Sequence, residues 1–151
     1  MKKVHLCVAL LLLVIMGTSC TKEKNLFERR VDMLVDKDWI QTAFLADNDG
    51  DGNPETNVFG FMSECDKDDL TFFDASGSYQ QKEGFSKCQE TDPDVITEGS
   101  WVLEEDASTL KMTDGAILIL NATISELSNT EMRYTFTEGN STFTATFKSR
   151  R

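Results

Sequence analysis

The chain has 151 residues, 27% of them charged, and a formal net charge of −11 at pH 7. An acidic surface of this kind repels phosphate backbones, which argues against nucleic-acid binding. The only histidine, His5, lies in the first apolar segment, so a mature chain without that segment has no histidine. The absence of histidine excludes the classes of Ser-His-Asp hydrolases, Cys-His proteases and His-ligated zinc enzymes.

The N-terminal segment has the organisation of a bacterial lipoprotein signal peptide. Lys2 and Lys3 precede an apolar run over residues 4–16. This run is too short for a bilayer span of about 20 residues and suits a secretory signal. Small residues then lead to Cys20, after which the chain becomes polar. We therefore predict that residues 1–19 are removed and that Cys20 becomes the lipidated first residue, carrying diacylglycerol and palmitate.

The processing site leaves an alternative, because Gly17 stands where a lipobox usually has leucine. An ordinary signal peptide would leave Cys20 as a plain thiol. Without Lys2 and Lys3, 13 basic residues face 26 acidic ones, for a net charge of −13. Charge therefore gives little grip on an anionic membrane, and the lipid on Cys20 is the expected anchor in the cell envelope, at the outer membrane. The remaining length corresponds to one domain.

A short tether, residues 20–25, leads into a predicted helix over Leu26–Val35. Asn25 and Glu28 have the spacing of a capping box. The apolar residues of this segment recur at helical spacing, which favours packing of one face against the domain over partner binding.

The rest of the chain, within a predicted domain of residues 26–151, is typical of short β-strands separated by turns. Residues 132–137 and 141–147 alternate strictly between apolar and polar side chains, which indicates one buried and one solvated face. About nine short strands and one N-terminal helix predict an all-β fold, an antiparallel up-and-down barrel of 8–9 strands, although a sandwich fits the same pattern. The further segments with strand character are residues 39–45, 57–62, 70–73, 78–81, 99–103, 109–112, 117–120 and 123–127.

A carboxylate-rich loop follows the first predicted strand. The residues that we expect to offer oxygen ligands there are Asp47, Asp49, Asp51, Asn53 and Glu55. Alternate acids wrapped round a turn can direct six to eight oxygens at Ca²⁺. Val58 occupies the position of the bidentate glutamate, so a true EF-hand is excluded. A weak structural calcium site and a plain hydrophilic turn both remain open, since Asp, Asn and Gly also favour turns.

Two cysteines remain if Cys20 is acylated and Cys7 leaves with the signal. In an oxidising compartment Cys65 and Cys88 are expected to pair, although two separate buried thiols are the alternative. The acidic residues around Cys65, from Glu64 to Asp69, indicate a solvated edge.

Four segments resemble, in their order and spacing, the lipocalin-like domains found on lipoproteins of Gram-negative bacteria. The resemblance covers roughly residues 33–147 and implies a small calycin-type barrel that binds something, with no catalytic residues to carry over. The segments are Lys37-Asp38-Trp39-Ile40, residues 65–79 (Cys65-Asp66-Lys67 through Gly77-Ser78-Tyr79), Glu83-Gly84-Phe85-Ser86-Lys87-Cys88 with Asp92-Pro93, and Glu98-Gly99-Ser100-Trp101-Val102-Leu103.

Three functions are consistent with this sequence. The first is a membrane-tethered, non-catalytic binding module for a small apolar ligand, a glycan or a protein. The second is a structural or interaction subunit of an envelope complex with a filled barrel. The third, an enzyme using paired carboxylates, is disfavoured because no recognisable catalytic motif is present. A binder should have a solvent-connected cavity lined by aromatic residues, for which the candidates are Phe44, Phe72, Tyr134 and Phe136.

Overall fold

The computed structural model describes residues 23–150. The expected signal peptide, residues 1–19, and Cys20 lie outside the described residues, so the lipid anchor stays a prediction. Within the described range, the model has no helix whose length and apolar character would carry it across a membrane.

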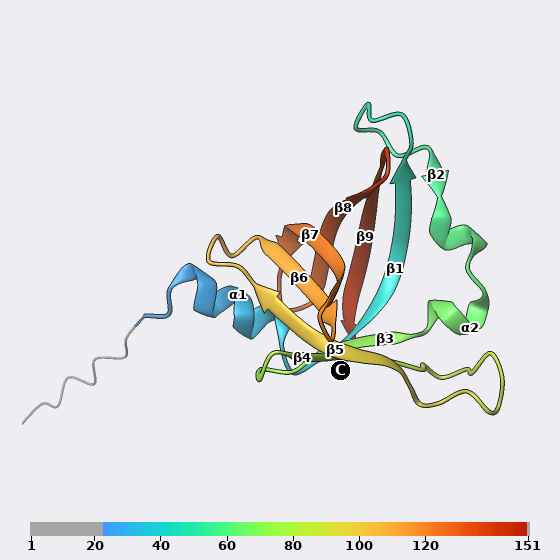
Figure 1. The fold of residues 1–151 in the computed structure, drawn as a ribbon, viewed down its shortest axis with the longest axis horizontal. Helices are drawn as coiled ribbons and strands as arrows, with labels where there is room; N and C mark the ends of the chain where they lie inside the picture. Colours follow the sequence, from blue (N-terminus) through green and yellow to red (C-terminus); the bar gives the residue numbers. More distant parts are fainter. Residues whose placement is uncertain (1–22, 151) are drawn as a thin grey trace, which may run out of the picture.

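The described chain folds into an antiparallel barrel of eight strands with one extra strand (Figure 1). Strands follow one another around the barrel, and β1 (Asp38–Asp47) closes it by pairing with β9 (Ser141–Arg150). The extra strand β2 (Thr56–Asn57) pairs with the far end of β1. The predicted up-and-down barrel is therefore confirmed, and the sandwich is not found. The other barrel strands are β3 (Leu70–Phe73), β4 (Ser78–Lys82), β5 (Val95–Leu103), β6 (Thr109–Asp114), β7 (Ile117–Leu127) and β8 (Glu131–Glu138).

Helix α1 (Leu26–Leu34) begins at the predicted capping box. The side chain of Asn25 accepts from the backbone N–H of Glu28, whose carboxylate accepts from the N–H of Asn25. The helix ends at a fully buried Leu34, whose carbonyl accepts a 2.8 Å hydrogen bond from the indole N–H of Trp39. This bond ties the end of the helix to the first residues of β1, so α1 packs against the barrel.

The barrel core contains Trp39, Phe73, Tyr79, Leu110 and Met132, each no more than 1% exposed. The alternation predicted for the last two strands is confirmed, because their apolar side chains face inward and pack as aromatic pairs. These pairs are Phe136–Phe143, with ring centroids 5.2 Å apart, Tyr134–Phe147 at 5.3 Å and Phe44–Phe143 at 5.5 Å.

Three predicted strands differ in the structure. In the segment 57–62, strand β2 ends at its first residue, Asn57, and the chain continues as the 3₁₀-helix η1 (Val58–Phe61). The side chain of Asn57 accepts a hydrogen bond from the N–H of Gly60, which turns the chain. Residues 117–120 and 123–127 are one strand, β7, since exposed Asn121 and buried Ala122 continue the alternation. After η1 comes the short helix α2 (Glu64–Lys67). Figure 1 shows this green segment running along the outside of the barrel beside β1.

Candidate ligand-binding pocket

A cavity of about 580 Å³ lies where β1 and β3 diverge. The two strands pair only from Asp38 to Ile40 on β1, so the barrel wall is incomplete beyond that point. The segment containing η1 and α2 and the loop between β4 and β5 surround the gap, and residues of both line the cavity. Its volume lies within the range of about 300–1,000 Å³ of pockets that enclose small molecules.

The barrel side of this cavity is polar. Gln41 of β1, Thr71 of β3 and Gln81 of β4 line it, together with Phe147 of β9. Residues directly opposite in a ladder share a face of the sheet. Thr71 lies opposite both Gln81 and the buried Trp39, which places Thr71 and Gln81 on the inward face.

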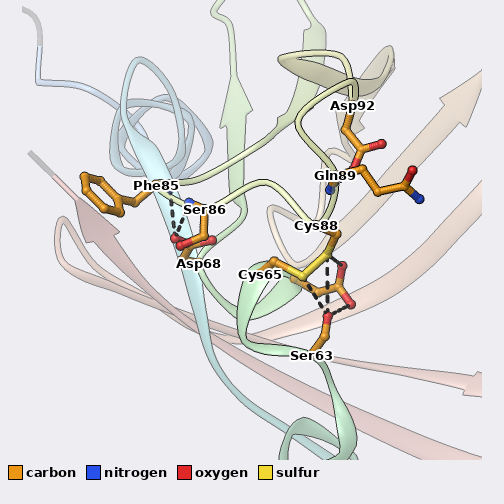
Figure 2. The surroundings of a disulfide bond; sticks show 9 residues. Ser63, Cys65, Asp68, Phe85, Ser86, Cys88, Gln89 and Asp92 are labelled. Carbon is orange, nitrogen blue, oxygen red and sulfur yellow. Dashed lines mark hydrogen bonds between the residues drawn. A yellow bond between two sulfur atoms is a disulfide. The ribbon is translucent and has the colours of Figure 1, made fainter.

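Two loops at the mouth of the cavity are joined covalently and by hydrogen bonds, and we call them the braced rim: residues 62–69 and 83–94. Cys65 and Cys88 form a disulfide with Cα atoms 5.2 Å apart, so their predicted pairing is confirmed (Figure 2). One carboxylate oxygen of Asp68 accepts from the backbone N–H of Phe85 at 2.8 Å and of Ser86 at 2.9 Å.

Gly84 shows how closely the two loops of the braced rim approach each other. A Cβ atom on this residue would lie 2.0 Å from the backbone oxygen of Asp68, so a larger residue would push the loops apart. The disulfide and these hydrogen bonds therefore restrain the position of the two loops relative to each other.

Four carboxylates line the cavity, from Asp66, Asp69, Glu83 and Asp92. The segment around Cys65 was expected to be a solvated edge, but the fold directs two of its acids, Asp66 and Asp69, into the cavity wall. The sequence interpretation missed this role because it depends on the incomplete β1–β3 pairing, which no local pattern signals.

Asp69 is the carboxylate most affected by these surroundings. Burial, followed by the charge of Glu83, raises the pKa of Asp69 to about 6, and the charges of Asp66 and Asp68 act in the same direction. A hydrogen bond from the backbone of Gly84 lowers the pKa but only in part. The Oδ1 atom of Asp69 is buried and accepts no hydrogen bond from any described residue.

The aspartate loop, residues 47–55 between β1 and β2, brings together four of its five predicted ligands. Asp47, Asp49, Asp51 and Glu55 each place one carboxylate oxygen within 4.8 Å of the others. Asn53 instead donates its backbone N–H to Asp51 at 2.7 Å. Burial raises the pKa of Asp47, but hydrogen bonds from the backbone of Gly52 and Gly50 outweigh it, so the pKa lies below the usual value and the group stays charged.

The aromatic residues proposed for a cavity lining lie elsewhere. Phe44, Tyr134 and Phe136 belong to the stacked group inside the barrel, and none of them lines this cavity. Phe72 points away from the core, where the ammonium group of Lys82 lies 4.9 Å from the centre of its ring. Phe147 is the aromatic residue that reaches the cavity.

A family model described as a lipocalin-like domain matches residues 35–134, about two thirds of the chain. The matched range runs from the end of α1 into β8 and includes the braced rim and the four cavity carboxylates. Among curated proteins, none matches the chain closely enough to be recognised as a relative.

Proposed function

Because the chain belongs to the lipocalin-like domain family, whose members are generally binding proteins, we propose that it is a non-catalytic binding module for a small molecule. The observation that carries this proposal is the cavity of about 580 Å³ beside the barrel interior. Its wall combines polar groups of Gln41, Thr71 and Gln81 with apolar surface from Phe147, the mixture that fixes orientation and supplies contact area in ligand sites.

The packing of the barrel supports a binder over a filled structural subunit. Around Trp39, Phe73 and Met132 the interior is closed by side chains that are at most 1% exposed. Beside Gln41 and Thr71 the space is left open. A barrel used only for its outer surface has no need of an incomplete wall with a braced rim, which supports a binding role for the open part of the barrel.

An enzyme is the less favoured alternative. Asp69, with its pKa of about 6, resembles a tuned general acid, and such groups mark active sites as well as binding sites. The shift is explained by burial and neighbouring carboxylates alone, and the sequence has no histidine after His5. We therefore assign Asp69 to binding.

The test is recovery of a retained ligand. The full chain is expressed in a Gram-negative host, extracted from membranes in detergent and examined by native mass spectrometry. We expect an added mass that is lost in Gln81→Phe, because the larger side chain fills the cavity. The added mass should be kept in Gln80→Phe, because the side chain of Gln80 lies on the opposite face of β4. An added mass that persists in Gln81→Phe would place the ligand elsewhere, and release of a cleaved product would indicate catalysis.

We further propose that the module is anchored in the cell envelope, at the outer membrane, through lipid on Cys20. Support comes from the signal-like residues 1–19 and from the disulfide between Cys65 and Cys88, which suits an oxidising compartment. Mass spectrometry of the mature N-terminal peptide tests this proposal. A diacylglyceryl modification on Cys20 is expected, and an unmodified thiol there would overturn the anchor while leaving the binding proposal intact.

The proposal also includes a structural calcium ion at the aspartate loop. Its support is the convergence of Asp47, Asp49, Asp51 and Glu55 at the end of β1. Oxygen ligands of this kind suit Ca²⁺, and loops of extracellular modules bind it at about 10⁻⁴–10⁻³ M. The ion would stiffen the turn between β1 and β2 and take no part in ligand binding.

A further inference from the structure

The chemistry of the cavity points to a ligand class. We propose that the ligand is an organic cation, a protonated amine or a guanidinium group on an apolar body. This inference rests on the proposed binding function and adds the sign of the ligand's charge to it.

The cavity carboxylates lack protein counter-ions among residues 23–150. Asp66, Asp69, Glu83 and Asp92 form no ion pair with any described lysine or arginine. The three lysines nearest in sequence to the cavity residues are paired with other acids. These pairs are Lys67 with Glu64 at 2.6 Å, Lys82 with Asp38 at 2.6 Å and Lys87 with Asp94 at 2.7 Å.

This arrangement leaves the negative charge of these carboxylates beside the cavity at the braced rim. Negative groups in a cavity with low-dielectric walls focus their field and raise the local concentration of cations. Asp69 belongs to this wall, and its buried Oδ1 accepts no hydrogen bond from a described residue, so its charge is poorly compensated by the protein. Asp92 has the ammonium group of Lys87 beside it, 2.7 Å from its backbone carbonyl oxygen, whereas Asp66, Asp69 and Glu83 are the acids that an ammonium or guanidinium donor would neutralise.

The distribution of the four acids favours an organic cation over a metal ion. Two groups of described residues bring three or more ligand atoms close enough to hold one metal ion. They are the aspartate loop and the set of Cys65, Asp66 and Cys88. In the second set both sulfur atoms belong to the disulfide and are not thiolates. The cavity carboxylates thus do not converge on one point, which suits a ligand with spread-out donors.

The remaining cavity wall matches the apolar body of such a ligand. Met62, Ile96 and Phe147 line the cavity together with the carboxylates. An aryl or alkyl group packed there would exclude water from the charge-assisted hydrogen bonds beside it, which strengthens them.

Three probes of one shape separate charge from shape. They are 3-phenylpropylamine, 3-phenylpropanol and 3-phenylpropionate, titrated calorimetrically into the full chain in detergent at pH 7.5. We expect the amine to bind at least about tenfold more tightly than the alcohol, and the carboxylate to give no measurable heat.

Variants then locate the charge effect. Asp69→Asn and Glu83→Gln each remove one cavity charge with little change of shape, and each should weaken amine binding about tenfold without changing binding of the alcohol. Glu105→Gln, an exposed acid outside the cavity, is the matched control and should change neither.

The outcomes distinguish this inference from the proposed function. Equal binding of amine and alcohol, with both lost in Gln81→Phe, would overturn the charge inference and support the binding module. Amine binding that is indifferent to Asp69→Asn, Glu83→Gln and Gln81→Phe would place it outside the cavity and overturn the inference. Absence of binding by all three probes at 10 mM would also overturn it, while the binding module is judged separately by the ligand retained from cells.

Discussion

A carboxylate oxygen of Asp68 lies 2.8 Å from the backbone nitrogen of Phe85 and accepts its hydrogen bond. The same oxygen accepts from Ser86, so one side chain after α2 fixes the start of the β4–β5 loop (Figure 2). The disulfide joins the same two loops a few residues away. The shape of the cavity therefore depends on these connections rather than on the barrel alone.

Replacing Asp68 with alanine is expected to destabilise the protein by about 1–3 kcal/mol. The backbone N–H groups of Phe85 and Ser86 would lose a charged acceptor. Hydrogen bonds to charged groups contribute about 1.5–3 kcal/mol net, and solvent exposure places these two toward the lower end. Urea denaturation followed by tryptophan fluorescence measures the change.

The control for this prediction is Glu64→Gln, in the same short segment. Glu64 pairs with Lys67 at the surface, and exposed pairs contribute about 0–1 kcal/mol. If Asp68→Ala costs no more than this control, the hydrogen bonds of Asp68 do not hold the braced rim together.

Removal of the disulfide with the double change Cys65→Ser and Cys88→Ser should lower stability by about 3.5 kcal/mol. This value follows from the entropy of closing the loop between two residues 23 positions apart. We also expect weaker retention of the ligand, because the loops that carry Asp66 and Glu83 would separate more easily. Reduction of the wild-type protein should reproduce both effects, and unchanged ligand retention after reduction would show that the barrel alone shapes the cavity.

The parts of this fold that were predictable are those with strong local patterns. The alternation of Met132, Tyr134 and Phe136 fixed the inward face of β8, and Asn25 with Glu28 marked the start of α1. The pairing of Cys65 with Cys88 followed from their number and from the expected oxidising compartment. The fold class was predictable because many short antiparallel strands leave no unpaired sheet edge when they close into a barrel.

The cavity itself was not predictable, because its causes lie far apart in the chain. Thr71 and Gln81 are polar side chains on short strands, and a strand of four or five residues gives too few positions to identify its inward face. Asp69 acquires its raised pKa from burial and from Glu83, which the β3–β4 hairpin and the braced rim bring near. A strand was also predicted where the chain turns, because the turn depends on one hydrogen bond from the N–H of Gly60 to the side chain of Asn57.

Calcium should stabilise the protein through the aspartate loop. For a dissociation constant of ~1 mM, 10 mM Ca²⁺ contributes about 1.4 kcal/mol, which raises the melting temperature by a few degrees. Asp49→Asn removes one charge of the cluster while keeping an acceptor for the N–H of Asp51, so it should make the increase smaller.

The matched control for the calcium prediction is Asp92→Asn, which removes an acid from the cavity and leaves the aspartate loop intact. It should keep the full response to calcium. A melting temperature that does not change with calcium in the wild-type protein, or that rises equally in Asp49→Asn, would identify the loop as a hydrophilic turn without an ion.

Ionisation of Asp69 should contribute a loss of stability as the pH rises from about 4 to 6. Its pKa is raised in the folded state, so the folded protein holds this proton more tightly than the unfolded chain. The penalty is absent below the unfolded pKa near 4 and is complete above pH 6. After allowance for the partial exposure of Asp69 and for solvent screening, about 1 kcal/mol is expected.

Asp69→Asn tests this prediction, because it removes the charge that the folded state disfavours. In urea denaturation at pH 7.5 the variant should be more stable than the wild type by about 1 kcal/mol, and at pH 4 the difference should vanish. Glu105→Gln, exposed and outside the cavity, should show no such pH-dependent gain. Saturation with 3-phenylpropylamine should reverse the advantage at pH 7.5, because a bound cation stabilises the ionised Asp69 of the wild type. An advantage that persists under saturation would show that Asp69 does not contact the cation.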